Sequence, residues 1–226
     1  LEEIPRIAPI VRTAQFLEVN APYLLLLTPS RFLRRSRVLV VPPLLRFEPP
    51  RVSRNPEPGL VLMIGRLEER KHYDIALKAL KIAKSRRPEL KLVVIGDGPL
   101  RRELQELAEK LWLSGCVEFK GRVTEEEKLE YLSKAEAFLH LGHPEGFSLV
   151  TLEAALAGVP CVVHRSTPVV ELLKLASIAT VGLEPGEVAR KLIETSQRPC
   201  RTVRISRELD FTKAYEEIYK VLLGYE

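Results

Sequence analysis

Two glutamates that flank a short glycine-containing segment are the residues best placed to do chemistry. Glu145 and Glu153 enclose Gly146-Phe147-Ser148-Leu149-Val150. Ser148 is predicted to cap a helix over residues 149–157 that ends at Gly158. The free N–H groups at the start of a helix bind anions, and carboxylates accept hydrogen bonds from hydroxyl groups. The pattern therefore predicts a site for a ligand that combines phosphate with sugar hydroxyls.

Two cations, Arg66 and Lys71, follow Gly65 where a strand is expected to end and a helix to begin. The positive end of a helix dipole disfavours cations, so a bound anion explains these residues better than the helix does. The alternative is a solvated, salt-bridged surface, because arginine and lysine elsewhere mostly alternate with glutamate. The chain carries only one local basic run, at residues 31–37, so a nucleic-acid partner is not expected.

Two further loops carry turn signals that structure alone would explain. Gly96-Asp97-Gly98-Pro99 is typical of a strand-to-helix turn in which glycine supplies a positive φ and proline enters the first helical turn. Thr124 and Glu127, which follow Arg122-Val123, are predicted to form a capping box.

These loops belong to a chain in which strands and helices alternate. Apolar runs predict strands over 60–65, 90–96, 117–121, 137–141, 159–164 and 178–182. Helical spacing predicts helices over 72–85, 100–113, 125–134, 149–157, 169–176 and 187–196. Strands that are apolar on both faces belong to parallel sheets, so we expect a doubly wound, Rossmann-like α/β fold. Ligands of such sheets bind beyond the carboxyl ends of the strands.

Composition supports a folded globular chain. Of 226 residues, 46% are hydrophobic and 29% are charged, which excludes a disordered tail, a collagen-like fibre and a disulfide-stapled miniprotein. No apolar run approaches the ~20 residues of a membrane span. Cys116, Cys161 and Cys200 fit neither a metal motif nor a disulfide framework, which favours reduced thiols and a cytoplasmic location. The few Asn, Gln and Met residues favour a thermophilic source.

Several motifs in one frame resemble those of a known family. Residues 145–153 form an EX7E motif that, with Ala157-Gly158-Val159-Pro160, resembles the donor-binding signature of retaining glycosyltransferases of the GT-B fold, particularly family four. The resemblance extends over about residues 22–223 and includes Gly65-Arg66 with Lys71, Gly96-Asp97-Gly98-Pro99, Gly121-Arg122-Val123 and Asp210-Phe211-Thr212.

The resemblance implies a metal-independent enzyme without a cofactor, which transfers a sugar from a nucleotide-diphosphate sugar to an acceptor with retention. Arg66 and Lys71 would hold the diphosphate and stabilise the leaving group. Glu145, the third residue of the catalytic set, would contact hydroxyls of the transferred sugar, and Glu153 those of the ribose. The other implied substrate-binding residues are Gly65, Gly146 and the backbone amides of Phe147, Ser148, Leu149 and Val150, with Arg122 and Val123 lining the base pocket.

The chain also departs from the family pattern. His72 and Ser148 stand where the family has glycine, and residues 161–168 lack its two-glycine turn, although Glu171 matches its acidic residue. His140, His143 and His164 come from different strand ends, so we expect no metal site there.

The resemblance also predicts how the chain is divided. Residues 1–45 would be a remnant of the N-terminal GT-B domain, with strands over 23–28 and 37–41 and a helix over 30–35. Residues 46–58 would be a proline-rich linker, 59–208 the nucleotide-sugar domain, and 209–226 a crossing helix that contains an amphipathic stretch over 213–223.

Because the acceptor-binding domain would lie elsewhere, a partner chain or a second copy could complete the enzyme. The acceptor could be a glycan, a lipid or a small molecule, with the enzyme in the cytoplasm or peripheral to the inner face of a membrane. The alternative is a non-catalytic nucleotide-sugar-binding half or scaffold that needs a partner chain for activity.

Overall fold

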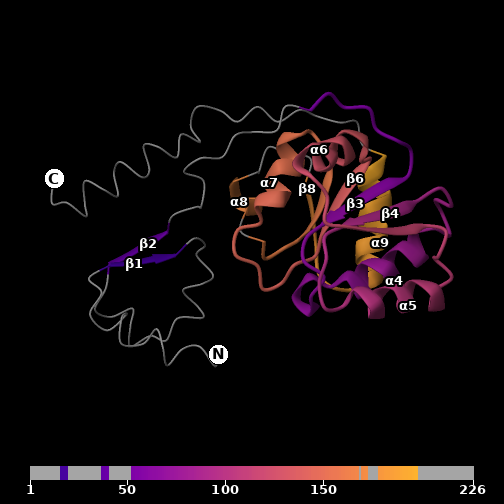
Figure 1. Ribbon diagram of the computed structural model, residues 1–226. Helices are drawn as coiled ribbons and strands as arrows, with labels where there is room; N and C mark the ends of the chain where they lie inside the picture. Colours follow the sequence, from indigo (N-terminus) through magenta and orange to yellow (C-terminus); the bar gives the residue numbers. More distant parts are fainter. Residues whose placement is uncertain (1–15, 20–36, 41–51, 168, 173–177, 198–226) are drawn as a thin grey trace. The chain divides into compact units, whose positions relative to one another are not determined.

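The computed structural model describes residues 16–19, 37–40, 52–167, 169–172 and 178–197 (Figure 1). These residues fall into two units. In the smaller unit, β1 (Phe16–Val19) pairs in parallel with β2 (Arg37–Val40). The prediction of a strand over 37–41 is therefore confirmed, whereas β1 was not anticipated from the sequence.

The larger unit is built on a six-stranded parallel sheet. In spatial order its strands are β5 (Val117–Gly121), β4 (Lys91–Ile95), β3 (Leu60–Ile64), β6 (Ala137–His140), β7 (Cys161–His164) and β8 (Ile178–Val181). The chain starts at β3, moves outward to β5 and returns to β6, so the order reverses between β3 and β6. This confirms the doubly wound, Rossmann-like fold. Ligands of such sheets generally bind beyond the carboxyl ends of the strands where the order reverses, which here are β3 and β6.

Helices cover both faces of this sheet. Figure 1 shows α4 (Tyr73–Ala83), α5 (Arg101–Lys110) and α9 (Pro185–Ser196) on one side, and α6 (Glu125–Lys134), α7 (Leu149–Leu156) and α8 (Val169–Leu172) on the other. The division follows from right-handed crossovers that run in opposite directions from the centre of the sheet.

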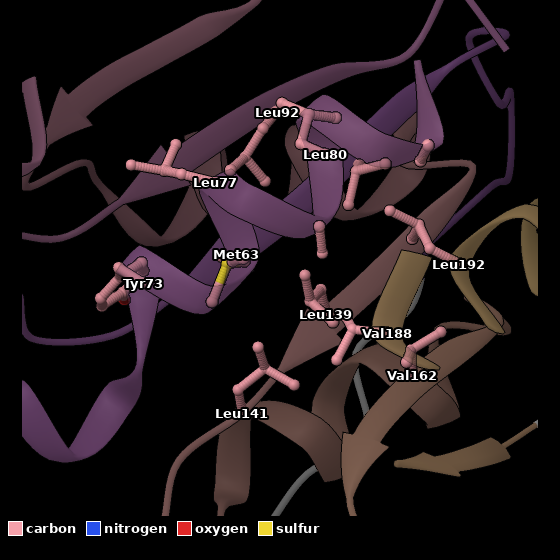
Figure 2. Close-up of a cluster of buried hydrophobic side chains, with 14 of the residues drawn as sticks. Met63, Tyr73, Leu77, Leu80, Leu92, Leu139, Leu141, Val162, Val188 and Leu192 are labelled. Atoms are coloured by element: carbon pink, nitrogen blue, oxygen red, sulfur yellow. The ribbon is translucent and has the colours of Figure 1, made fainter. Parts of the chain in front are cut away.

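One hydrophobic cluster of the core lies between the sheet and the first of these helical layers. Met63, Leu92, Leu139 and Val162 from the strands pack with Leu77 and Leu80 of α4 and with Val188 and Leu192 of α9 (Figure 2). Each of these side chains is at most 3% exposed. Full burial of such a side chain contributes roughly 1.5–3 kcal/mol, so this layer holds the strand ends in a fixed frame.

Local signals explain the start of α6 and the end of α7. The predicted capping box begins α6, because Glu127 N donates to Thr124 Oγ1 at 3.2 Å and Thr124 N donates to Glu127 Oε2 at 2.8 Å. Gly158, with a φ of +77°, follows the end of α7 as predicted. Pro99 lies in the turn before α5 and not in its first turn, because that helix begins only at Arg101.

The helix predicted over 72–85 is present as α4, but an unpredicted element comes before it. A short 3-10 helix, η1 (Glu69–Lys71), precedes α4, and His72 separates the two with a φ of +51°.

The predicted strand over 23–28 and the helices over 30–35 and 213–223 lie outside the described residues. The four-part division of the chain stays a prediction. No helix within the described ranges is both long enough and apolar enough to cross a membrane.

Candidate functional site

Backbone hydrogen bonds join the loops that follow β3 and β4. Leu67 N donates to Asp97 O at 3.0 Å, and Gly65 N donates to Ile95 O at 2.9 Å. Gly96 has a φ of +127°, and a Cβ atom there would lie 2.0 Å from Gly65 O. Only glycine fits at this contact. The predicted turn is thus confirmed, and it also forms a seam with the loop that carries Arg66.

A hollow of about 600 Å³ opens beside this seam. It is lined by Arg66, by Gly96 to Pro99 and by Arg122. The Arg66 side chain is 71% exposed, and its nearest carboxylate oxygen, Glu68 Oε2, lies 3.7 Å from Nε. So long and exposed a contact holds the guanidinium weakly. The hollow therefore offers Arg66 and Arg122 to an anion.

A second group of residues lies where the loops after β3 and β6 meet. Lys71 Nζ donates to Glu145 Oε2, and Arg70 Nη1 lies 3.4 Å from Glu145 Oε1. His140 Nε2, at the end of β6, lies 3.3 Å from Glu145 Oε2. The side chains of Lys71 and Glu145 are only 13% and 11% exposed. Sequence reasoning placed Lys71 with Arg66 at a diphosphate, but here Lys71 bonds to the other expected catalytic residue.

The charges in this group follow from its surroundings. Burial raises the pKa of the Glu145 carboxyl, but hydrogen bonds from His140 and Lys71 outweigh burial and bring the pKa well below its usual range. Burial lowers the pKa of His140, aided by the charges of Lys71 and Arg70, although Glu145 opposes the shift. At neutral pH the site therefore holds an anionic Glu145 beside a neutral His140.

Ser148 precedes α7 as predicted but does not cap it with its side chain. Its φ of +67° is left-handed, whereas a capping serine is usually extended. Ser148 Oγ instead lies 3.2 Å from His140 Nε2 and 2.7 Å from Thr151 Oγ1. The expected capping bond is therefore wrong, because the backbone conformation turns this hydroxyl toward β6.

The segment between the two glutamates is open on one side. Leu149 is exposed, and no atom lies within 4 Å of the place that a Cβ atom on Gly146 would occupy. Phe147 is buried, and Val150 is half-buried in the first turn of α7. The N–H groups of a first helical turn have no partner within the helix, so a ligand could approach this one.

Glu153 is also paired with a lysine. Lys128 Nζ of α6 lies 2.8 Å from Glu153 Oε2 and 2.7 Å from Glu125 Oε1. Burial lowers the pKa of Lys128, but its hydrogen bonds to the two carboxylates outweigh burial and leave the pKa raised. Nearby, Gly121 O accepts from Gly96 N at 2.7 Å, which joins the Arg122-Val123 loop to the seam.

All four histidines of the chain lie at or near this edge of the sheet. His143 Nδ1 and His164 Nδ1 lie 2.7 and 2.8 Å from Ser166 Oγ, and their ring centroids are 4.7 Å apart. His72 Nε2 lies 3.2 Å from His143 O. Among the described residues, no group of three or more His, Cys, Asp or Glu side chains is arranged to hold a metal ion.

Sequence reasoning did not identify His140, Arg70 or Lys128 as contacts of the two motif glutamates. Of these three residues, only His140 had a signal in the sequence, because it is a polar residue at the carboxyl end of an apolar strand. The side chain of Glu171, which matches the family's acidic residue, lies outside the described ones.

Known proteins resemble this chain in sequence and in fold. A sequence model of the family described as "Glycosyl transferases group 1" matches residues 46–202. The GDP-mannose-dependent α-(1-6)-phosphatidylinositol dimannoside mannosyltransferase of Mycobacterium tuberculosis is 30% identical over 143 residues, which cover 63% of this chain and 36% of that protein. A phosphatidylinositol N-acetylglucosaminyltransferase subunit of Schizosaccharomyces pombe is 27% identical over 144 residues, which cover 62% and 32%.

A solved structure supports the same assignment of fold. The pneumococcal O-GlcNAc transferase GtfA, crystallised with UDP and GlcNAc, matches with a TM-score of 0.74 and 15% identity over 98% of this chain and 48% of that one. In the sequence alignments, this chain spans only about a third of the length of each of the two relatives named above. The family match covers more than half of this chain. The chain therefore belongs to the group 1 glycosyl transferases, with the Rossmann-like fold of a GT-B half.

Proposed function

We propose that the larger unit binds a nucleotide-diphosphate sugar in the loops that follow β3, β4, β5 and β6. In the complete enzyme, the sugar would be transferred to an acceptor with retention of anomeric configuration. The observation that supports this most directly is the meeting of Lys71 with Glu145 at the point where the strand order reverses. Ligands of doubly wound sheets bind at that point.

The diphosphate would lie between the Arg66 hollow and Lys71. Arg66 is weakly held and exposed, so it can reach a phosphate at little cost. Lys71 would exchange its bond with Glu145 for one with the diphosphate. Two cations at the leaving group stabilise the negative charge that develops as the glycosidic bond breaks. These residues could supply that stabilisation without a metal ion.

The carboxylates of Glu145 and Glu153 would accept hydrogen bonds from the hydroxyl groups of the donor. An ionised carboxylate only accepts hydrogen bonds, so anionic Glu145 suits the hydroxyls of the transferred sugar. Glu153 would accept from the ribose hydroxyls, with Arg122 and Val123 at the base. Backbone N–H groups of residues 147–150 would complete the contacts with sugar and phosphate. Those of Gly65 and Gly146 already donate to Ile95 O and Glu145 Oε1, so these two glycines would only line the site.

Glu145 suits an acceptor of hydrogen bonds better than a nucleophile. Its carboxylate is held by Lys71, His140 and Arg70, and a lone pair engaged in such bonds is less available for attack. We therefore favour a front-face route to retention. In that route the leaving phosphate accepts the proton of the attacking acceptor hydroxyl.

The acceptor would be bound by a part of the enzyme other than the larger unit. Two relatives are named for action on phosphatidylinositol lipids, and one of them is named as a subunit. A lipid-linked acceptor at a membrane surface, and a second domain or partner chain that binds it, are accordingly our favoured extensions.

Calorimetry of the full chain with UDP, GDP, ADP and their glucose, mannose and N-acetylglucosamine derivatives tests the donor-binding role. At least one nucleotide sugar should bind, and Glu153→Ala should weaken binding roughly tenfold, as for one lost hydrogen bond to a charged group. Glu106→Ala, on an exposed face of α5, is the matched control. The proposal fails if no nucleotide sugar binds, or if Glu153→Ala leaves the affinity of the wild type unchanged.

A further inference from the structure

His140 forms a buried polar contact that none of the donor roles above uses. It ends β6, is 3% exposed, and places Nε2 3.3 Å from Glu145 Oε2 and 3.2 Å from Ser148 Oγ. Ser148 Oγ in turn lies 2.7 Å from Thr151 Oγ1 inside the first turn of α7. Burying such polar groups is costly unless they bond to one another. The contact therefore ties the strand, the Glu145 carboxylate and the helix into one network.

The backbone is shaped around this contact. A Cβ atom on Gly142 would lie 2.6 Å from Glu145 Oε2 and 2.9 Å from His140 Nε2. Gly142 does not have a positive φ. Its lack of a side chain therefore serves the approach of Glu145 to His140 and not the backbone conformation.

The three side-chain partners of Glu145 differ in their freedom to leave it. Lys71 would turn to the diphosphate when a donor binds. Arg70 is 44% exposed and contacts Glu145 at 3.4 Å, so its hold is weak. His140 lies at the end of a buried strand, and burial lowers the pKa of its imidazole, so the ring is neutral at neutral pH before a donor binds. It is the side-chain partner that remains, on Oε2, while the backbone N–H of Gly146 donates to Oε1 at 3.2 Å.

We propose that His140 is a positioning residue, which holds the Glu145 carboxylate toward the sugar hydroxyls when Lys71 leaves it for the diphosphate. The neutral ring donates Nε2–H, because a carboxylate can only accept. Ser148 Oγ, 3.2 Å from the same nitrogen, can share this N–H as a second acceptor, a weaker contact that links the ring to the first turn of α7. This role rests on the proposed function and adds a residue to it.

The test separates the sugar from the rest of the donor. UDP-glucose, GDP-mannose and ADP-glucose are titrated into the full chain beside UDP, GDP and ADP, and the dissociation constant of each diphosphate is divided by that of its sugar. For the pair that the wild type binds best, His140→Leu should lower this ratio roughly tenfold, as for one lost bond to a charged group. The affinity for the bare diphosphate should stay within about twofold.

A conservative variant distinguishes positioning from folding. In His140→Gln, the side-chain amide N–H can replace Nε2–H, so most of the ratio should return. The role is overturned if His140→Leu keeps the wild-type ratio, or if both variants weaken diphosphate and sugar alike. If the wild type binds no nucleotide sugar, the proposed function itself fails and the positioning role falls with it.

A measurement without ligand guards against a misfolded variant. In ¹⁵N spectra of the wild type, the His140 imidazole should be neutral with the proton on Nε2. Glu145→Gln should shift that Nε2 signal, whereas Glu194→Gln, a surface carboxylate paired with Arg190 and Lys191, should not. If the Nε2 chemical shift is unchanged in Glu145→Gln, His140 does not contact Glu145, and the positioning role is overturned regardless of the calorimetric result.

Discussion

The two glutamates of the EX7E motif are each paired with a lysine from another element, but the charge around the two pairs differs. Glu145 lies between two cations, Lys71 and Arg70, and Arg70 also pairs with Glu68, whose Oε1 lies 2.6 Å from Nη2. Lys128 is one cation between two carboxylates, Glu153 and Glu125. With Glu68 included, the first group has as many cations as carboxylates, whereas the second has one carboxylate in excess. In the proposed site, Lys71 would turn to a phosphate, while the excess negative charge around Glu153 would repel phosphate and accept from ribose hydroxyls.

Removal of Glu145 should break the comparison most strongly. Glu145→Ala deletes the acceptor and leaves Lys71 and His140 without their shared partner. We expect a loss of roughly 100-fold in nucleotide-sugar affinity, as for two bonds to a charged group. Glu194→Ala is the matched control, because Glu194 also pairs with two cations but on an exposed helix face. Equal calorimetric affinities of the two variants would refute the role of Glu145.

The two lysines should differ in their effect on the bare nucleoside diphosphate. Lys71→Ala removes a cation from the phosphate side, and we expect the affinity to fall roughly 30-fold. Lys128→Ala removes a cation that two carboxylates already engage, so the change should stay within about threefold. Lys78→Ala, on the exposed face of α4, serves as the control. Similar losses from Lys71→Ala and Lys128→Ala would abolish the distinction between the two pairs.

Acid should sharpen the comparison, because two groups near the first pair titrate in separate windows. Burial, aided by His143 and His72, lowers the pKa of His164 to about 4. An unfolded histidine has a pKa of about 6.5, so the unfolded chain binds the proton first. The free energy of unfolding should therefore fall from about pH 6.5 to 4. Glu145, whose pKa is lowered, contributes stability that is present above about pH 4.3 and lost below it.

Urea unfolding at several pH values measures both windows. His164→Gln should remove about 1–2 kcal/mol of the fall between pH 6.5 and 4.5, a figure reduced for solvent screening. Glu145→Gln should change only the part below about pH 4.5. Identical pH profiles for the wild type and both variants would contradict the assignment.

Ser148→Gly should have the smallest effect. Glycine favours the left-handed backbone at this position, which offsets the loss of the hydroxyl bonds to His140 and Thr151. We expect stability to change by less than about 1 kcal/mol. Nucleotide-sugar affinity should change by less than about threefold. A larger loss would mean that the hydroxyl holds His140 more firmly than its 3.2 Å contact indicates.

The sheet could be predicted from the sequence because strands such as Leu60–Ile64 and Lys91–Ile95 carry runs of Val, Ile and Leu that suit burial on both faces. The short 3-10 helix before α4 could not, since it ends at His72 in a positive φ that few residues other than glycine adopt. Local propensity thus identified the elements, while boundaries depended on neighbouring loops.

The site was predictable in its loops and not in its contacts. Glu145 and Lys71 were identified because strand ends meet at one edge. Lys128 reaches Glu153 from another helix, and its sequence neighbours suggested only a solvated face. His140 sits at the end of an apolar run, where its pairing depends on the unexpected left-handed backbone of Ser148. Such contacts arise from tertiary geometry, which no spacing along the chain encodes.

The glycine seam between the loops after β3 and β4 limits how donor preference could be engineered. A side chain at Gly96 would collide with Gly65 O, and one at Gly98 would come within 2.4 Å of Leu67 O. Libraries that vary these positions should yield mostly damaged proteins. Arg122 is exposed and Val123 half-buried beyond the seam, so they can be randomised without opening it. In the proposed site, a change of nucleotide base should therefore be sought at Arg122 and Val123, with Gly96 and Gly98 left unchanged.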